Sequence, residues 1–238
     1  MKWIKIGLII PSSNTTVERE FRFNEPEITV HTSRILLPDV TLKSLEMMER
    51  ETERAAVELK TAKVDIIAYA CTTGSLFKGP NHHEMIKQRI ESKTGISAIA
   101  TSGAVINALR TLGAKRVLVV TPYIEELNAK EKQFLEAHGF DVIDIKGLGI
   151  IDNTEIGSLE PKYNYEYIMS VARKYDRERY DALFISCTNW RTFEIINQLE
   201  EELNKPVISS NSATLWEIMK TLKITPPIRL GKLFKEHL

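Results

Sequence analysis

The sequence predicts an α/β fold of two pseudo-symmetric halves, each a parallel, Rossmann-like sheet with helices, and an active site between the halves. Short runs of bulky apolar residues alternate with longer amphipathic stretches over nearly the whole chain of 238 residues, which is typical of parallel strands crossed by helices. An acidic residue, an apolar run and the pair Cys-Thr occur twice, so that Cys71 and Cys187 lie 116 positions apart. A chain of this length can bury the core of one large domain or of two domains of about 100 residues each.

Eight apolar runs are the predicted strands. They cover residues 4–10, 28–35, 64–70, 96–100, 117–121, 141–145, 182–186 and 206–209. The stretches between them carry helical patterns. In residues 41–61, apolar side chains such as Leu42 and Leu45 fall largely on a period of 3.6 residues, which predicts an amphipathic helix. The same period is present in residues 104–109 and 193–203.

The order of elements also repeats. The first and fifth strands each end at a proline, Pro11 and Pro122, and each leads into a predicted helix. No Gly/Ser-rich or low-complexity linker separates the halves, so we expect them to pack closely. The predicted parts are an N-terminal half at residues 1–112, completed by a C-terminal helix within residues 213–238, and a C-terminal half at residues 113–212.

Composition and charge exclude several classes of function. The chain carries 32 basic and 32 acidic side chains, and this balance provides no long-range field for nucleic acids or anionic membranes, so we predict neither partner. The apolar N-terminal run is short and is interrupted by Lys5, and no other run approaches the roughly 20 apolar residues of a membrane span. We therefore expect a soluble, cytoplasmic protein with reduced thiols.

The two cysteines are predicted to lie at the carboxyl ends of strands, where parallel sheets bind their ligands. Clusters of hydroxyl and amide side chains occupy the same ends, at residues 11–14, 71–73, 121–123, 187–189 and 209–211. A cysteine near a helix N-terminus can have its pKa lowered from about 8.5 toward neutrality, which supplies a thiolate as nucleophile or base. A single free cysteine is more often an ordinary core residue. Two at equivalent strand ends, Cys71 and Cys187, favour a reactive pair.

The ordered set of motifs resembles the aspartate/glutamate racemase superfamily, and more closely its maleate isomerase and arylmalonate decarboxylase branch. The motifs are residues 11–18, 31–34, 65–71, 121–123 and 186–189, and the resemblance extends over residues 4–223. It implies chemistry on a small carboxylic acid through an enediolate-like intermediate, without cofactor or metal. In maleate isomerases the first cysteine adds to the double bond, so the resemblance implies that Cys71 is the nucleophile and Cys187 the acid/base partner. It further implies that Asn14, Tyr123 and Asn153 hold the carboxylates and that Thr72, Thr73 and Thr188 add donors.

Three alternatives to a maleate isomerase-like enzyme stay open. Arylmalonate decarboxylases typically have glycine at the position of Cys71, and amino-acid racemases usually carry Cys-Thr-His where this chain has Asn189 after Cys187 and Thr188. The pair Trp190-Arg191 departs from the maleate isomerase pattern and leaves the exact substrate open. A carboxylate-binding sensor without turnover is the third alternative, although the chain has no separate output domain. We also expect a homodimer or a higher homo-oligomer.

Several features have simpler interpretations. Thr15 and Glu18 have the spacing of a capping box, with Thr15 as the N-cap of a helix. The pair His82-His83 lacks the spacing of a metal site, and we expect a solvated helix start there. Residues 147–149 lack the third glycine of a dinucleotide fingerprint. We expect the tail at residues 224–238 to pack against the body or against a partner subunit.

Overall fold

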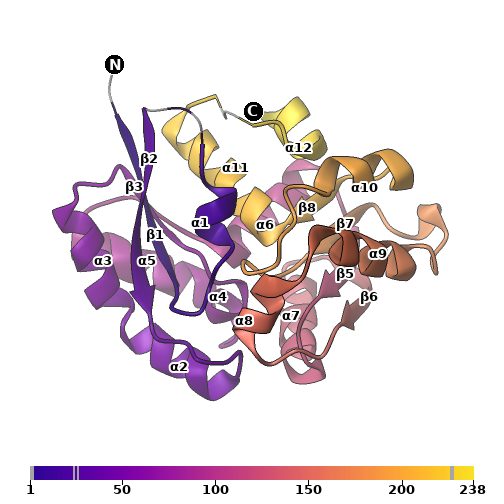
Figure 1. Cartoon of the computed structure of the whole chain (residues 1–238), viewed down its shortest axis with the longest axis horizontal. Helices are drawn as coiled ribbons and strands as arrows, with labels where there is room; N and C mark the ends of the chain where they lie inside the picture. The colour runs from indigo at the N-terminus through magenta and orange to yellow at the C-terminus, as the bar shows by residue number, and fades with distance from the viewer. Residues whose placement is uncertain (1–2, 24, 26, 226–227) are drawn as a thin grey trace.

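The computed structural model describes residues 3–23, 25, 27–225 and 228–238 and contains two four-stranded parallel sheets (Figure 1). Their strand orders, β2-β1-β3-β4 and β6-β5-β7-β8, follow the same pattern. The strands are β1 Ile4–Pro11, β2 Ile28–Ile35, β3 Ile66–Tyr69, β4 Ala98–Ala100, β5 Arg116–Thr121, β6 Asp141–Gly147, β7 Ala182–Ile185 and β8 Val207–Ser209. The predicted α/β fold of two similar halves is thus confirmed, with all eight strands near their predicted positions.

Helices surround both sheets. Those of the first half are α1 Val17–Glu20, α2 Leu42–Arg50, α3 Thr52–Thr61, α4 Thr72–Leu76, α5 His82–Thr94 and α6 Thr101–Thr111. The others are α7 Glu125–Ala137, α8 Asn153–Ser158, α9 Pro161–Ala172, α10 Ile196–Leu203, α11 Ser210–Leu222 and α12 Gly231–His237, with a 3₁₀ turn at Arg177–Arg179.

The single helix expected over residues 41–61 was wrong, because two helices occupy it. The chain leaves helical geometry at Glu51, whose backbone has φ −92° and ψ 0°. Helix α2 packs against α4, whereas α3 packs against α5 and β2. Because the two helices pack on different elements, their axes differ in direction. The periodic pattern gave no sign of this change of partner.

The strand ends lie level with one another at one edge of each sheet. In the first sheet Tyr69 pairs with Ile9 on one side and with Ala100 on the other. In the second sheet Ile185 pairs with Val120 and Ser209 in the same way. The loops that follow these strands therefore start side by side, which is the arrangement that gathers ligand-binding groups in open parallel sheets.

Helices α6 and α11 join the two halves near the centre of the molecule (Figure 1). The Thr214 hydroxyl of α11 donates to the Thr101 hydroxyl of α6 at 3.0 Å. Helix α12 buries Leu233 and Phe234 and contacts α6, α10 and β8, so the described tail packs against the body as expected. Residues 226–227 of that tail lie outside the described residues, and the predicted domain boundaries stay a prediction.

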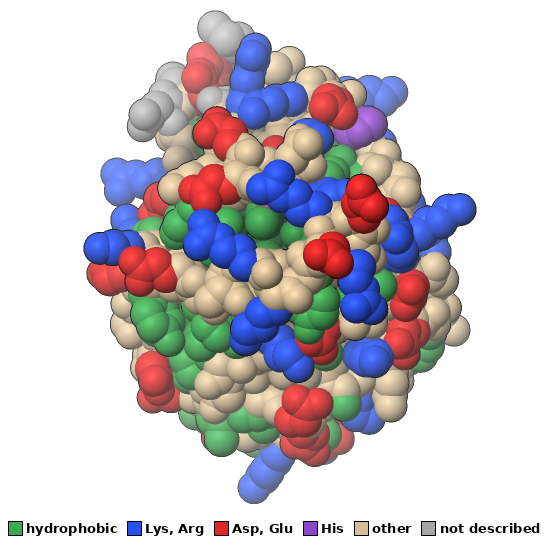
Figure 2. Space-filling model, turned by 90° about the vertical axis from the view of Figure 1, so that its right-hand side faces the viewer, with side chains coloured by type: hydrophobic (Ala, Val, Ile, Leu, Met, Phe, Trp, Pro, Cys, Tyr) green, Lys and Arg blue, Asp and Glu red, His purple; other side chains and the backbone are tan. Residues whose placement is uncertain are grey.

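The surface is of mixed charge. Figure 2 shows Lys and Arg side chains interspersed with Asp and Glu on one face of the molecule, so positive charge does not gather there. Within the described part of the chain, no helix combines the length and the hydropathy that crossing a bilayer requires.

Candidate active site

Cys71 lies just beyond β3, at the N-cap of the short helix α4. Its backbone is extended, with φ −146°, and its Sγ accepts a hydrogen bond from the Gly74 N–H at 3.4 Å. The Thr73 hydroxyl lies 3.9 Å from the same sulfur. A side chain at position 74 would place its Cβ only 2.8 Å from that sulfur, so this close approach needs glycine. The first thiol therefore lies at a helix start, as expected.

Cys187 occupies the matching position after β7 but has a different backbone. Its φ is +109°, a region that residues with a side chain rarely adopt, and no helix begins until Ile196. Its N–H donates to the Ser210 hydroxyl at 3.0 Å, and its Sγ accepts from the Asn189 N–H at 3.3 Å. The expectation that a helix start follows this cysteine was wrong, because residues 188–195 form turns that pack against the first half.

The two thiols share one buried site with Tyr123. Each cysteine is free and only 4% exposed, and Tyr123 is 2% exposed. The Tyr123 hydroxyl lies close enough to Cys187 to lower the pKa of that thiol, and a charge on Cys71 raises it. The same charge on Cys71 also raises the pKa of Tyr123. The three groups are therefore close enough to feel one another's ionisation.

Burial dominates the acidity of both thiols. It raises the pKa of Cys71 to about 11, with only partial relief from the Gly74 N–H and the Thr73 hydroxyl. It raises the pKa of Cys187 to about 12, although the Tyr123 hydroxyl and the Asn189 N–H lower that value. The expected lowering of the thiol pKa is therefore wrong for both cysteines, because loss of water outweighs the few donors. Both thiols carry their protons at neutral pH.

Asn14 holds the start of α1 and reaches across to the second half. Its Oδ1 accepts from the N–H groups of Thr16 and Val17 at 2.9 and 3.0 Å, and its Nδ2 donates to the Thr188 hydroxyl at 3.2 Å. The predicted capping box was therefore wrong, since Thr16 is the N-cap and Asn14 satisfies the free N–H groups. Asn14 and Thr188, two predicted donors, are in direct contact.

Asn153 begins α8 and is 3% exposed. Its side-chain Nδ2 donates to the Ser13 hydroxyl at 2.9 Å, and its carbonyl oxygen accepts from the Asn189 side chain at 2.5 Å. Asp152, which precedes it, caps the helix by accepting from the N–H groups of Thr154 and Glu155. The ordinary turn chemistry thus belongs to Asp152, and Asn153 lies beside the loops of both halves.

Thr72 is connected to Cys187 through a residue absent from the predicted site. The Thr72 hydroxyl donates to the Ser210 hydroxyl at 2.8 Å, and the same oxygen accepts from the Cys187 N–H. Ser210 lies within the polar strand-end cluster 209–211, so the sequence did carry a signal for it. The structure brings all eight predicted site residues to this boundary between the halves, although their roles stay predictions.

Glu20 is a second residue that the sequence analysis missed. This carboxyl of α1 accepts from the N–H groups of Thr192 and Phe193 at 2.6 and 2.9 Å and from the Asn211 side chain at 2.6 Å. Asn211 also donates to the Thr188 carbonyl at 2.9 Å. Glu20 shares a face with the buried Val17 and Phe21, and a charged residue on an apolar face was the signal available.

Trp190 and the two histidines are structural. Trp190 is fully buried, and its indole N–H donates to the Asn164 side chain at 2.7 Å. The expected solvated start at His82-His83 was wrong, since they are 2% and 7% exposed. Both rings pack edge-on against aromatic rings, His82 on Phe77 and His83 on Phe134 of α7.

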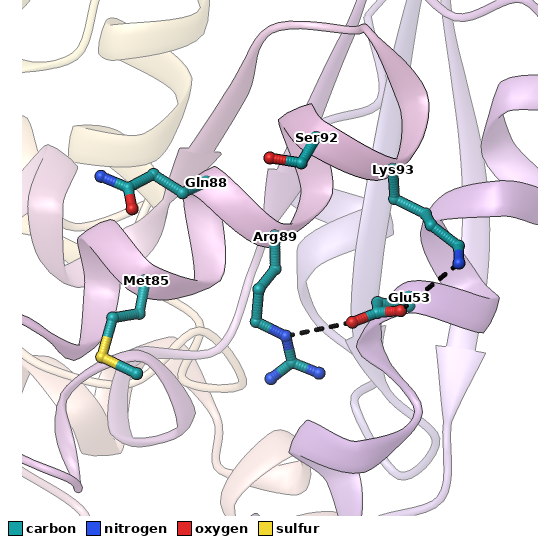
Figure 3. A pocket seen from close by; sticks show the side chains of 6 residues that line it. All are labelled: Glu53, Met85, Gln88, Arg89, Ser92 and Lys93. Carbon is teal, nitrogen blue, oxygen red and sulfur yellow. Dashed lines mark hydrogen bonds and ion pairs between the residues drawn. The ribbon is translucent and has the colours of Figure 1, made fainter.

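The surface groove along α3 and α5 lies outside this constellation. Figure 3 shows its charged side chains turned toward one another, with Arg89 and Lys93 both directed at Glu53. The ion pairs measure 3.4 and 3.6 Å. Its basic groups are thus already paired, and none of the predicted site residues lines this groove.

Comparisons with known proteins agree with the two-cysteine arrangement. The profile of the arylmalonate decarboxylase family matches residues 6–234. The maleate isomerase of Geobacillus stearothermophilus is 32% identical over 238 aligned residues, covering 94% of this chain and 93% of that protein.

Two solved structures superpose on nearly the whole chain. A cysteine-to-alanine variant of the Pseudomonas putida S16 maleate isomerase with maleate is 30% identical, with a TM-score of 0.90 and 99% of both chains covered. A cysteine-to-serine variant of the Nocardia farcinica maleate cis-trans isomerase, holding a covalently bound succinylcysteine intermediate, is 31% identical, with the same TM-score and coverage. Because profile, sequence and fold agree over almost every residue, this chain belongs to the arylmalonate decarboxylase family, within which its similarity to maleate isomerases spans the full length.

Proposed function

We propose that this chain is a maleate cis-trans isomerase that uses two cysteines and no cofactor. The observation that carries the proposal is the pair of free, buried thiols, one from each half, that share a site with Tyr123. The full-length similarity to maleate isomerases supports it, as does the succinylcysteine intermediate in the Nocardia farcinica relative.

In the proposed reaction Cys71 is the nucleophile. Its thiol gives its proton to water, and the resulting thiolate forms a bond to one carbon of the double bond, while the π electrons move onto the other carbon and the carboxylate it carries, as an enediolate. Cys187 donates its proton to the other carbon of the former double bond, which gives a succinyl adduct on Cys71 and leaves Cys187 as a thiolate. Rotation about the new single bond follows. Cys187 then takes the proton back, the carbon–sulfur bond breaks, and fumarate leaves with Cys71 again a thiolate.

Neutral donors hold the two carboxylates in this proposal. Asn14, Tyr123 and Asn153 bind the carboxylate oxygens, and Thr72, Thr73 and Thr188 add hydroxyl donors. Oriented dipoles in a site that excludes water interact strongly with a developing negative charge, so an enediolate is stabilised without a cation. Because both thiols are only 4% exposed, the loops around them must move to admit the substrate.

Conversion of maleate to fumarate, followed by proton NMR with both thiols reduced, tests the proposal. We expect turnover without added metal or cofactor. No conversion at high enzyme concentration would exclude maleate as the substrate.

Decarboxylation and racemisation are disfavoured by particular residues. A decarboxylase of this family needs one thiol, whereas Cys71 supplies a second beside the first. Racemases usually carry histidine where Asn189 forms hydrogen bonds to Thr15 and to the Asn153 carbonyl. Candidate acids in deuterium oxide distinguish these activities, through deuterium incorporation at the α-carbon or release of carbon dioxide.

We further propose that the enzyme is cytoplasmic and forms a homodimer or a higher homo-oligomer. A reducing compartment keeps Cys71 and Cys187 as thiols, which the reaction requires. Light scattering coupled to size-exclusion chromatography measures the oligomeric state, and a monomeric mass at micromolar concentration would contradict the second part.

A further inference from the structure

Glu131 is a buried carboxyl that the proposed reaction does not use. It lies on the inward face of α7, between the buried side chains Asn128 and Phe134, and is 0% exposed. A carboxyl in such a position lowers stability unless it is paired or neutral. A buried group of this kind beside a reactive site points to a role in the chemistry.

The Glu131 carboxyl lacks hydrogen-bond partners among the described residues. Among the described residues neither of its oxygens has a hydrogen-bond partner, and the Ser186 hydroxyl is unpaired as well. Ser186 lies close enough for its hydroxyl to lower the pKa of Glu131, but burial outweighs it and raises that pKa to about 8. At neutral pH Glu131 is therefore mainly a carboxylic acid.

Its position connects it to one thiol rather than to both. Ser186 immediately precedes Cys187, and a charge on Glu131 raises the pKa of Cys187 and of Tyr123. Cys71 is affected by burial and by its own donors, Gly74 and Thr73, with no contribution from this carboxyl. Glu131 therefore acts on the Cys187 side of the site.

The other elements packed on α7 leave Glu131 without a competing charge. Helix α4, which contacts α7, consists of five uncharged residues. Strand β6 carries Asp141, which is exposed, and Asp144 and Lys146, which pair with each other at 3.0 Å. His83 of α5 meets Phe134 of α7, about one turn beyond Glu131, and the C-cap residue His138, about two turns beyond it.

We propose, building on the isomerase function above, that Glu131 is a positioning residue for Cys187. As a neutral acid it lies uncharged behind the Ser186 strand end and leaves the Cys187 thiol able to give its proton to the substrate carbon. As a carboxylate it places a negative charge behind Cys187 and Tyr123, so that Cys187 becomes a weaker acid. Above the pH at which Glu131 ionises, Cys187 therefore donates its proton to the substrate less readily.

Thiol labelling tests the coupling independently of turnover. The protein and its Glu131→Gln variant are treated with iodoacetamide from about pH 7 to about pH 9.5, and alkylation of Cys187 and Cys71 is quantified by mass spectrometry. Cys71 in the same molecule is the internal control for access and folding. We expect the ratio of Cys187 to Cys71 labelling rates to fall about threefold to tenfold as the pH passes about 8, and to stay level in Glu131→Gln. An identical ratio in both proteins would overturn the proposal.

Kinetics supply the second measurement. In the unmodified enzyme kcat/KM should rise less steeply with pH above about pH 8. Glu131→Gln should keep most of its activity at pH 7 and should not show this inflection. Glu217→Gln, which removes a carboxyl on α11 whose pKa burial also raises, is the matched control and should keep the inflection. If Glu131→Gln does not fold, Glu131→Met takes its place. A labelling effect without maleate turnover would support the coupling and refute the substrate, so the two proposals fail separately.

Discussion

The Cys71 and Cys187 segments share the pair Cys-Thr and a position after the third strand of each half, yet their backbones differ. Cys71 is extended and starts a helix, whereas Cys187 has φ +109° and leads into turns. The difference arises downstream. Gly74 lets α4 pass close to the first sulfur, while Asn189 reaches across the boundary to Thr15 and Trp190 packs against Asn164 and Tyr167 of its own half.

The two segments also differ in what holds them. The Cys71 sulfur accepts a hydrogen bond from its own helix, at Gly74. The Cys187 segment is bound by the first half, through Asn14 on Thr188 and through Glu20 by way of Asn211. The repeat in the sequence thus predicts that the two cysteines lie near each other. The residues that follow each cysteine determine its backbone conformation and its hydrogen bonds. We interpret the first thiol as the one placed for attack and the second as the one placed for proton transfer.

The largest expected effect comes from removing either sulfur. We expect Cys71→Ser and Cys187→Ser each to lower maleate turnover by roughly 10³-fold or more. Intact-protein mass spectrometry separates them. Cys187→Ser should accumulate an adduct heavier by one maleic acid on Cys71, whereas Cys71→Ser should show none. An adduct on Cys187 would reverse the assignment of the two roles.

The pH dependence of turnover provides the next test of the comparison. Cys71 must lose its proton, and Cys187, whose pKa is about 12, keeps its own over the working range. Because the pKa of Cys71 is about 11, its thiolate fraction grows with pH, and kcat/KM should rise by up to about tenfold per pH unit below pH 8. A rate that falls over this interval would show that another group limits the reaction.

Glu20 provides a test of how the Cys187 segment is anchored. Burial raises its pKa from 4.5 to about 7. A carboxyl whose folded pKa is raised stabilises the fold fully below about pH 4.5, and this stabilisation is lost as the pH rises through about 7. The loss amounts to about 3 kcal/mol. Urea unfolding from about pH 5 to about pH 8 should show it, and Glu20→Gln should flatten the dependence. Glu18→Gln, on the outer side of the same helix, is the control and should keep the slope.

The smallest expected effect concerns the backbone of the two cysteines. At position 187 the positive φ favours glycine, so Cys187→Gly should be more stable than Cys187→Ala by about 1 kcal/mol. At position 71 the extended backbone removes that advantage, so Cys71→Gly should be less stable than Cys71→Ala by a similar amount. If urea unfolding ranked the Gly and Ala variants in the same order at both positions, that result would contradict the difference in backbone conformation.

The sequence predicted the fold well because its signals are local and repeated. Each strand is a run of bulky apolar residues, and the halves present the same order of elements, so the eight strands and the boundary site followed from periodicity. Cys71 and Cys187 were found for the same reason, since the repeated Cys-Thr pair marks equivalent strand ends.

The remaining features depend on contacts between distant segments. The burial of His83 and Glu131 arises where elements of the first half pack on α7 of the second, which no local pattern encodes. The break at Glu51 reflects a change of packing partner, and the acidity of the thiols reflects loss of water in the closed site. Capping by Asn14 in place of Thr15 depends on a loop geometry in which the amide also spans to Thr188.

The Ser210 hydroxyl connects the loops that follow β3 and β7. One oxygen atom accepts the Thr72 hydroxyl at 2.8 Å and the Cys187 N–H at 3.0 Å, so the two reactive loops are tethered at a single point. The Ser210 hydroxyl thereby fixes the spacing between the Thr72 segment and the Cys187 backbone. A single hydroxyl group therefore links the loops that carry the two thiols.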